Sequence, residues 1–228
     1  GIYGKDSTIN NSGNITSGNT NASGIFGTGS SVINHLGGTV TVGNSSVGLA
    51  TDSGSIVNNS NLVTGTGSVS IYSNTGTGIN NVALTAADGS IGMYTEAGLM
   101  TNNSIITTGK SDINSDAYSI GMATISGKVV NNNNITAAGE AGIGMYAGGT
   151  GSAENYSIID VTGSKAYGMY GANGATLYNA GTINVDGTNA KGIVGTNNAM
   201  ITNDGTIHVN GTDSQGVYID KGATRANN

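Results

Sequence analysis

A short motif recurs along the chain every 22 to 24 residues, with a single longer step of 29 residues. It consists of a small residue, usually Gly, then an apolar residue, and then a residue that is often aromatic. Its ten copies begin at the anchor residues Gly1, Gly24, Gly48, Ser70, Gly92, Gly121, Gly144, Gly168, Gly192 and Gly216. A fixed period of this size is typical of a solenoid, in which each repeat forms one coil and packs only on its neighbours. We therefore expect about ten stacked coils.

The composition agrees with coils made of short strands and turns. The 228 residues include 40 Gly but no Pro and no Cys, and only 9% are charged. Asn, Ser, Thr and Gly form turns, and the short runs of Ile, Val and Met between them favour strands. Three short strands per coil predict an all-β parallel β-helix.

Alternation along a strand assigns the residues after the anchor to opposite faces. The first of them is apolar in all ten coils, so we expect it to point into the core. The second then points outward, and it is aromatic in seven coils: Tyr3, Phe26, Tyr72, Tyr94, Tyr146, Tyr170 and Tyr218. This stripe has two interpretations. Stacked rings stabilise a solenoid, by about 0.5 to 1.5 kcal/mol per pair, and the same rings could also contact a partner.

A second column consists of asparagines near a corner of the coil. Most of them stand eleven residues after their anchor, whereas Asn11 and Asn34 stand ten after theirs. Stacked amides can hydrogen-bond to one another and to the turn backbone. We predict an inward structural ladder formed by Asn59, Asn81, Asn103, Asn132, Asn155, Asn179 and Asn203, with Asn227 at the same position of the next coil.

The longest step contains the one clear departure from the repeat. Twelve residues separate Gly109 from Gly121, where regular coils use five. Residues 110–118 should therefore bulge from a corner as an insertion loop, and loops on a rigid scaffold often carry recognition. The candidate binding residues in this loop are Lys110, Asp112, Asn114, Asp116 and Tyr118.

The most enzyme-like set consists of Asp160, Asn184 and His208. Each stands sixteen residues after its anchor, so the three should stack outward on the third strand. Glycoside cleavage needs two suitably spaced acids, and no second acid joins this column. We therefore expect no catalytic residues and no enzyme.

Other chemistries lack their residues as well. The absence of Cys removes thiolate metal sites, and no Gly-Gly-x-Gly-x-Asp repeat offers calcium ligands. We expect neither a metal nor a cofactor. The net charge of −6 and seven scattered cations provide no basic face for nucleic acid.

Three segments resemble a known family. Gly-Ile-Tyr-Gly at residues 1–4, Ser-Thr-Ile-Asn-Asn-Ser-Gly-Asn-Ile at 7–15 and Ala-Thr-Leu-Tyr-Asn-Ala-Gly-Thr-Ile-Asn-Val-Asp-Gly at 175–187 resemble passenger domains of type V secretion autotransporter adhesins, most of all the large fusobacterial outer-membrane adhesins. The resemblance covers the whole chain and implies a right-handed β-helix rod. It also implies that residues 1–228 are one β-helix segment of a longer passenger domain, displayed outside the cell by a C-terminal outer-membrane β-barrel that lies beyond this segment.

The resemblance implies a function in attachment. Rods of that family bind other bacteria in coaggregation and biofilm, or host cells, through surface proteins or glycans. We therefore expect a segment of a surface-displayed adhesin, anchored to the outer membrane in the full-length protein. The alternative is a secreted polysaccharide lyase or hydrolase on the same fold.

Overall fold

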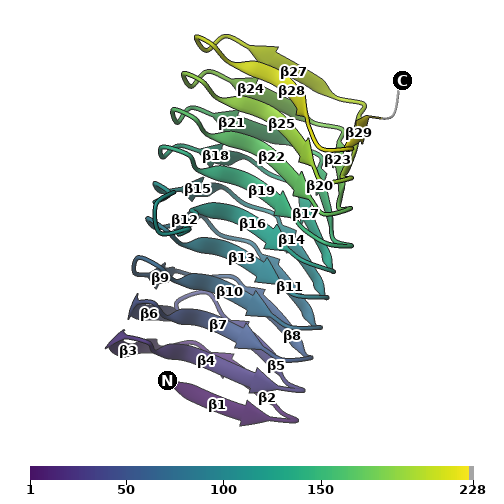
Figure 1. Ribbon diagram of the computed structural model, residues 1–228. Helices are drawn as coiled ribbons and strands as arrows, with labels where there is room; N and C mark the ends of the chain where they lie inside the picture. Colours follow the sequence, from purple (N-terminus) through teal and green to yellow (C-terminus); the bar gives the residue numbers. More distant parts are fainter. Residues whose placement is uncertain (226–228) are drawn as a thin grey trace.

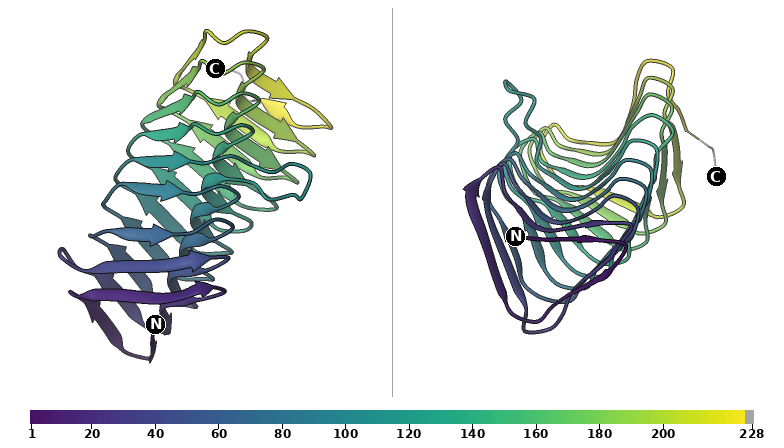
Figure 2. Two further views of the ribbon diagram at one scale, coloured as in Figure 1. Left: turned by 90° about the vertical axis from the view of Figure 1, so that its left-hand side faces the viewer. Right: turned by 90° about the horizontal axis from the view of Figure 1, so that it is seen from below.

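The structure, a computed structural model, describes residues 1–225 and is a parallel β-solenoid of about nine turns (Figure 1). Each coil runs through three faces in the same order and stacks on the coil before it. Seen from the N-terminal end, the chain turns clockwise as it recedes from the viewer, so the solenoid is right-handed (Figure 2). The expected all-β parallel β-helix with three short strands per coil is confirmed.

The first face of the solenoid is one sheet of ten parallel strands within the described residues. In spatial order they are β1 (Ile2–Lys5), β4 (Ser23–Thr28), β7 (Val47–Thr51), β10 (Val69–Ser73), β13 (Ile91–Thr95), β16 (Ile120–Thr124), β19 (Ile143–Ala147), β22 (Tyr167–Ala172), β25 (Lys191–Thr196) and β28 (Gln215–Ile219). Every anchor that begins a coil after the first lies inside one of these strands.

The second face is also one parallel sheet, with ten strands in residues 1–225. They are β2 (Thr8–Asn11), β5 (Ser31–Asn34), β8 (Ser55–Asn58), β11 (Thr77–Asn80), β14 (Leu99–Asn102), β17 (Lys128–Asn131), β20 (Ser152–Asn155), β23 (Thr176–Asn179), β26 (Met200–Asn203) and β29 (Thr224–Arg225). Nine of these strands end in Asn, which places those asparagines at one corner of the rod.

The third face is divided into two parallel sheets. The N-terminal sheet contains β3 (Asn14–Thr20), β6 (Thr39–Asn44) and β9 (Leu62–Thr64). The other sheet contains β12 (Leu84–Ala86), β15 (Ile106–Thr108), β18 (Ile135–Ala137), β21 (Ile158–Val161), β24 (Thr182–Val185) and β27 (Thr206–Val209). The sheets of the first two faces are therefore continuous, whereas the third face is interrupted once, between β9 and β12.

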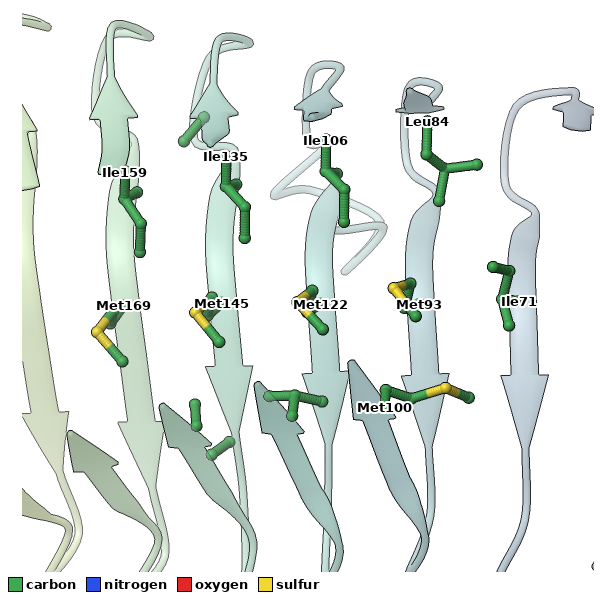
Figure 3. Packing of buried hydrophobic residues seen from close by; sticks show 14 of the residues in the cluster. Ile71, Leu84, Met93, Met100, Ile106, Met122, Ile135, Met145, Ile159 and Met169 are labelled. Atoms are coloured by element: carbon green, nitrogen blue, oxygen red, sulfur yellow. The ribbon is translucent and has the colours of Figure 1, made fainter. Parts of the chain in front are cut away.

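Columns of identical or similar apolar side chains fill the core. Met93 and Met169 end a run of four stacked methionines on the first face. A column of Leu84 and isoleucines, among them Ile159, stacks on the third face (Figure 3). The predicted inward position after the anchor is confirmed from Ile25 to Ile193, where every side chain is fully buried. These columns provide the apolar burial that stabilises the rod.

The anchor glycines mark a bend in the strands of the first face. A Cβ added at Gly144 would lie 2.6 Å from the carbonyl oxygen of Gly168 and 3.0 Å from Cγ2 of Ile159, a core residue. The next residue, Met145, also points into the core. Two successive positions therefore face inward, and Gly occupies the first of them in nine of the ten coils, with Ser70 as the exception, because little room is left beside the neighbouring coil. Seen along the axis, the first face of the later coils bends inward (Figure 2).

The inward asparagine ladder is present, but four of its members were assigned wrongly. Successive side chains donate from Nδ2 to the Oδ1 of the next coil over 2.7 to 3.0 Å. The ladder consists of Asn11, Asn34, Asn58, Asn80, Asn102, Asn131, Asn155, Asn179 and Asn203. The prediction is right for the last three, whereas Asn227 lies outside the described residues.

The four misassigned asparagines are Asn59, Asn81, Asn103 and Asn132. Each follows a ladder residue directly, so it points to the opposite face, and together they form a second, outer ladder with Nδ2 to Oδ1 distances of 2.8 to 3.1 Å. The error arose because these coils carry an Asn-Asn doublet. The turn before the second strand also changes length, from three residues at 125–127 to four at 148–151, which moves the inward Asn from ten to eleven residues after its anchor.

Candidate binding groove

Because of the bend at the anchor glycine, two columns of side chains lie on the outer surface of the first face. One column directly precedes the anchors and contains Val47, Val69, Ile91, Ile120, Ile143, Tyr167, Lys191 and Gln215. The other is the predicted aromatic stripe. Without the bend, strict alternation would place only one of the two columns outside.

The aromatic stripe points outward as predicted, and its rings contact one another across coils. Ring centroids lie 5.8 Å apart in the pair Tyr3 and Phe26, and 6.0 Å apart in the pair Tyr146 and Tyr170. Small residues interrupt the stripe, among them Ala123 in the coil before Tyr146. Stacking therefore stabilises parts of the stripe.

A second hydrophobic cluster forms in this outer surface, outside the main core. Ile120, Ala123 and Ile143 are its buried members, and Ile143 is only 5% exposed although it belongs to an outer column. Tyr94, Tyr146, Tyr167 and Tyr170 pack around them. The outer surface of β13 to β22 is thus a small apolar basin lined by tyrosine rings.

The insertion loop beside this basin has its own internal hydrogen bonds. The amide of Asp112 donates to the carbonyl of Ala117 over 2.8 Å, and the amide of Ala117 donates back over 3.0 Å. The carboxylate of Asp112 accepts from Ser115 Oγ and from the amide of Asn114, and these bonds lower the pKa of Asp112. The loop is therefore a defined hairpin.

Ser111 attaches the hairpin to the rod. Its amide donates to the carbonyl of Glu140 over 2.9 Å, and its Oγ donates to the carbonyl of Ala141 over 2.7 Å. The same Oγ accepts from the amide of Ser119 over 2.9 Å. The loop projects at the edge of the inward-bent first face (Figure 2), and this attachment holds Tyr118 at the rim of the basin.

We name the resulting feature the aromatic groove. It consists of two adjoining hollows of about 440 Å³ each, which share Tyr167 and Tyr170 as a common wall. The apolar hollow is also lined by Tyr118, Ile120, Ile143, Tyr146 and Ala172. The polar hollow is also lined by Lys191, Val194, Thr196, Gln215, Tyr218, Asp220 and Lys221.

Lys191 stands between two rings of the polar hollow. Its Nζ lies 5.7 Å from the ring centroid of Tyr167 and 5.6 Å from that of Tyr218. Cation–π contacts of this kind hold an ammonium group in place without neutralising it. The ion pairs found within residues 1–225 join Lys128 to Glu154 and Lys165 to Glu140, so Lys191 has no carboxylate partner there.

Three tyrosines of the groove have a raised pKa. Burial raises the pKa of Tyr146, Tyr167 and Tyr170, and neighbouring tyrosines add to the effect for the last two. Their hydroxyl groups are therefore neutral and can both donate and accept hydrogen bonds. A ligand in the groove meets apolar ring faces, neutral hydroxyls and one fixed cation.

Comparison with known proteins identifies the family. Residues 63–228, more than half of the chain, match the BigA third pectate lyase-like domain. The chain belongs to this family. The match includes the insertion loop and the strands β13 to β28 that carry the aromatic groove. No curated protein and no solved structure matches the chain.

The family describes a β-helix domain of BigA, and it specifies neither a ligand nor a reaction. BigA is a bacterial surface adhesin-like protein, and the match is not specific to fusobacterial autotransporters. The site must therefore be interpreted from its own geometry, because a shared fold does not determine function.

The five candidate binding residues of the insertion do not form one site. Tyr118 lines the apolar hollow, whereas Lys110 lies on the other flank of the loop, where its amide donates to Asp88 Oδ1 over 2.7 Å. Asp112 and Asn114 lie in the hairpin near Glu140 and Lys165. Asp116 is exposed in the hairpin with a positive φ of 54°. Of the five, only Tyr118 reaches the groove.

Sequence reasoning missed Ile143, Tyr167 and Lys191. All three precede an anchor, and strict alternation gives this position the same inward direction as the core residue after the anchor. The column itself held a signal, because Lys191 and Gln215 occupy it and such side chains are rarely buried. A charged residue in a column of Val, Ile and Tyr indicates an outward face.

The enzyme-like column lies on another face of the rod. Asp160, Asn184 and His208 stack in register on β21, β24 and β27, as predicted. Asn184 Nδ2 donates to Asp160 Oδ1 over 2.7 Å, and His208 is exposed.

Within residues 1–225 no three His, Cys, Asp or Glu side chains converge to hold a metal ion. The described residues contain no helix of the length and apolarity that a membrane span requires.

Proposed function

We propose that the chain is a non-enzymatic segment of a surface-displayed bacterial adhesin, in which a β-helical rod presents the aromatic groove to a partner. The observation that carries this proposal is the apolar hollow. It exposes Tyr118, which is 39% exposed, and it lies over Ile143 and Ile120 outside the core. A contiguous apolar patch rimmed by polar residues is characteristic of an interaction site. Membership of the BigA family supports a surface role.

Preorganisation supports a binding role for the groove. Three hydrogen bonds of Ser111 fix the hairpin, and the tyrosine walls are packed against buried neighbours. A partner therefore orders few additional groups on docking, which lowers the entropic cost of association. Tyrosine is also enriched among residues that dominate interface energies.

The resemblance to autotransporter passengers supplies the cellular setting of this proposal. In that setting the rod stands outside the cell, the full-length protein is anchored in the outer membrane, and the partner is a surface protein or glycan of another bacterium or of a host cell. The family match supports surface display in general. The relationship to fusobacterial adhesins is the more specific part of the proposal.

A polysaccharide lyase or hydrolase is the second candidate, favoured by the pectate lyase-like description and by the outward column of Asp160 and His208. The carboxylate of Asp160 is occupied by Asn184, and a general acid–base pair needs a second positioned group. Incubation of the chain with polygalacturonate and other glycans tests this candidate. Shortened or unsaturated products that disappear in Asp160→Asn would establish it.

The adhesin proposal is tested by replacing the insertion with a turn that already fits the rod. Residues 110–118 are exchanged for Glu-Ala, the pair found at Glu140 and Ala141 in the next coil, which restores the regular five-residue step. Cells that display the full-length protein with this exchange should adhere less than cells that display the unaltered protein at the same surface level. Unchanged adhesion to every bacterial and host cell type that the parent binds would refute a role for this site.

A further inference from the structure

We propose that the partner of the aromatic groove is a protein segment in which an apolar side chain stands beside a carboxylate. This inference rests on the proposed function, since it names the chemistry of the partner that the same site binds. It follows from the two hollows taken together, which share the wall formed by Tyr167 and Tyr170. One is apolar, and the other holds two lysines that form no ion pair within residues 1–225.

The apolar hollow fits a hydrocarbon or aromatic side chain. Its floor consists of Ile120, Ile143 and Ala172, and its walls are rings of Tyr118, Tyr146 and Tyr170. The polar atoms of these side chains are the tyrosine hydroxyls alone. A sugar placed here would leave many hydroxyl groups without partners, which costs affinity. A Leu, Phe or Trp side chain would instead bury apolar surface, which favours binding.

The polar hollow fits a carboxylate. Lys191 is held between two rings. Neither Lys191 nor Lys221 forms an ion pair within residues 1–225. Asp220 also lines this hollow, and its Oδ1 accepts the amide of Lys221 over 2.7 Å. Two lysines against one aspartate leave the hollow with a net positive charge. A partner carboxylate would meet an ammonium group that is already positioned.

The direction of the groove fits an extended chain. It crosses five coils, from β16 to β28, and adjacent strands of a sheet lie about 4.8 Å apart, so it is about 19 Å long. An extended peptide covers this length with about six residues. An apolar residue and an acidic residue of one short segment can therefore occupy the two hollows at the same time.

The probe for this proposal is a random library of 12-residue peptides, selected on the immobilised 228-residue chain. We expect the selected peptides to share an apolar residue close to Asp or Glu. Synthetic peptides from the selection, measured by isothermal titration calorimetry, should bind about tenfold more weakly to Lys191→Gln. Their affinity should also fall in Tyr118→Ala and with rising salt.

The matched control is Lys128→Gln, which removes the same charge from the second face, where Lys128 pairs with Glu154. It should leave the affinity unchanged. Variants are compared only if their melting temperatures agree with wild type. Lys191→Arg keeps the charge and should retain most of the binding.

Three outcomes overturn the inference: selected peptides without an acidic residue, equal losses in Lys191→Gln and Lys128→Gln, or no peptide enrichment alongside binding on a glycan array. The last outcome replaces the peptide by a sugar but leaves the adhesin proposal intact. If adhesion survives the insertion exchange while peptides still bind, the adhesin proposal fails and the groove specificity stands.

Discussion

Substitution of neighbouring asparagines tests the register of the coil, because Asn102 and Asn103 belong to different ladders. Asn102 is fully buried. Its Nδ2 donates to Asn131 Oδ1 over 3.0 Å and also to the carbonyl of Ser104, and its Oδ1 accepts from Asn80 Nδ2 over 3.0 Å. Asn103 is exposed, and water can replace its two amide partners in the outer ladder.

The expected magnitudes differ clearly. Asn102→Ala removes the hydrogen bonds of Asn102 to Asn80, Asn131 and Ser104, each worth about 1 kcal/mol. Asn80 Nδ2 keeps its bond to the carbonyl of Val82, and Asn131 Oδ1 keeps its bond from the amide of Asn133. We expect a loss of about 2 to 3 kcal/mol in unfolding free energy, which lowers the melting temperature of a chain this long by about 5 to 10 °C. Asn103→Ala, as a surface substitution, should change stability by at most about 0.5 kcal/mol.

Circular dichroism during heating measures both variants. Solenoids need not unfold in one step, so the comparison uses the transition that wild type and both variants share. Equal shifts for the two substitutions, or a larger shift for Asn103→Ala, would refute the assigned register. Asn155→Ala provides a further point, since Asn155 lies in the inner ladder and is followed by Tyr156 instead of a second Asn.

Two further predictions follow from the packing. Gly144→Ala should lower the melting temperature and disturb the groove, because the added Cβ would lie 2.6 Å from the Gly168 carbonyl oxygen. Overpacking of this kind costs about 1 to 3 kcal/mol. Gly174→Ala, at a turn position where φ is 91°, serves as a comparison for backbone strain. The pKa of Tyr94 is raised by burial and by its hydrogen bond to Glu96. The stability that this tyrosine contributes should therefore be fully present below pH about 10, where unfolded tyrosine ionises, and should be lost as the pH rises further. In melting experiments from pH 8 to 12, Tyr94→Phe should flatten the fall in stability, and an equally steep fall in this variant would contradict the assignment.

The repeat made the architecture predictable because every coil obeys the same constraints. An apolar residue after each anchor and a corner Asn suffice to place three faces and a core, and the buried columns from Ile25 to Ile193 bear this out. The prediction of the ladder residues was wrong where two adjacent asparagines matched the pattern equally well. The choice between Asn102 and Asn103 depends on the length of a turn, and one residue reverses the face.

The groove was less accessible to sequence reasoning. Its rim residue Tyr118 was selected because the insertion is an irregularity in the repeat. Tyr146, Tyr170 and Tyr218 were selected as members of the outward aromatic stripe, whose rings could also contact a partner. The floor residue Ile143 lies outside the core because a bend at Gly144 cancels the alternation. Such a bend depends on the close approach of the next coil, which is a tertiary contact. In the sequence it was indicated by Lys191 and Gln215 in the same column.

Competition by the purified chain tests the binding role of the groove most directly. Wild-type chain, added to cells that display the full-length parent, should occupy the partner and reduce adhesion in proportion to its concentration. The double variant Tyr118→Ala and Lys191→Gln, with an unchanged melting temperature, should fail to compete, whereas Lys128→Gln should compete like wild type. Equal competition by all three proteins, or competition by none of them, would contradict the assignment of binding to the aromatic groove.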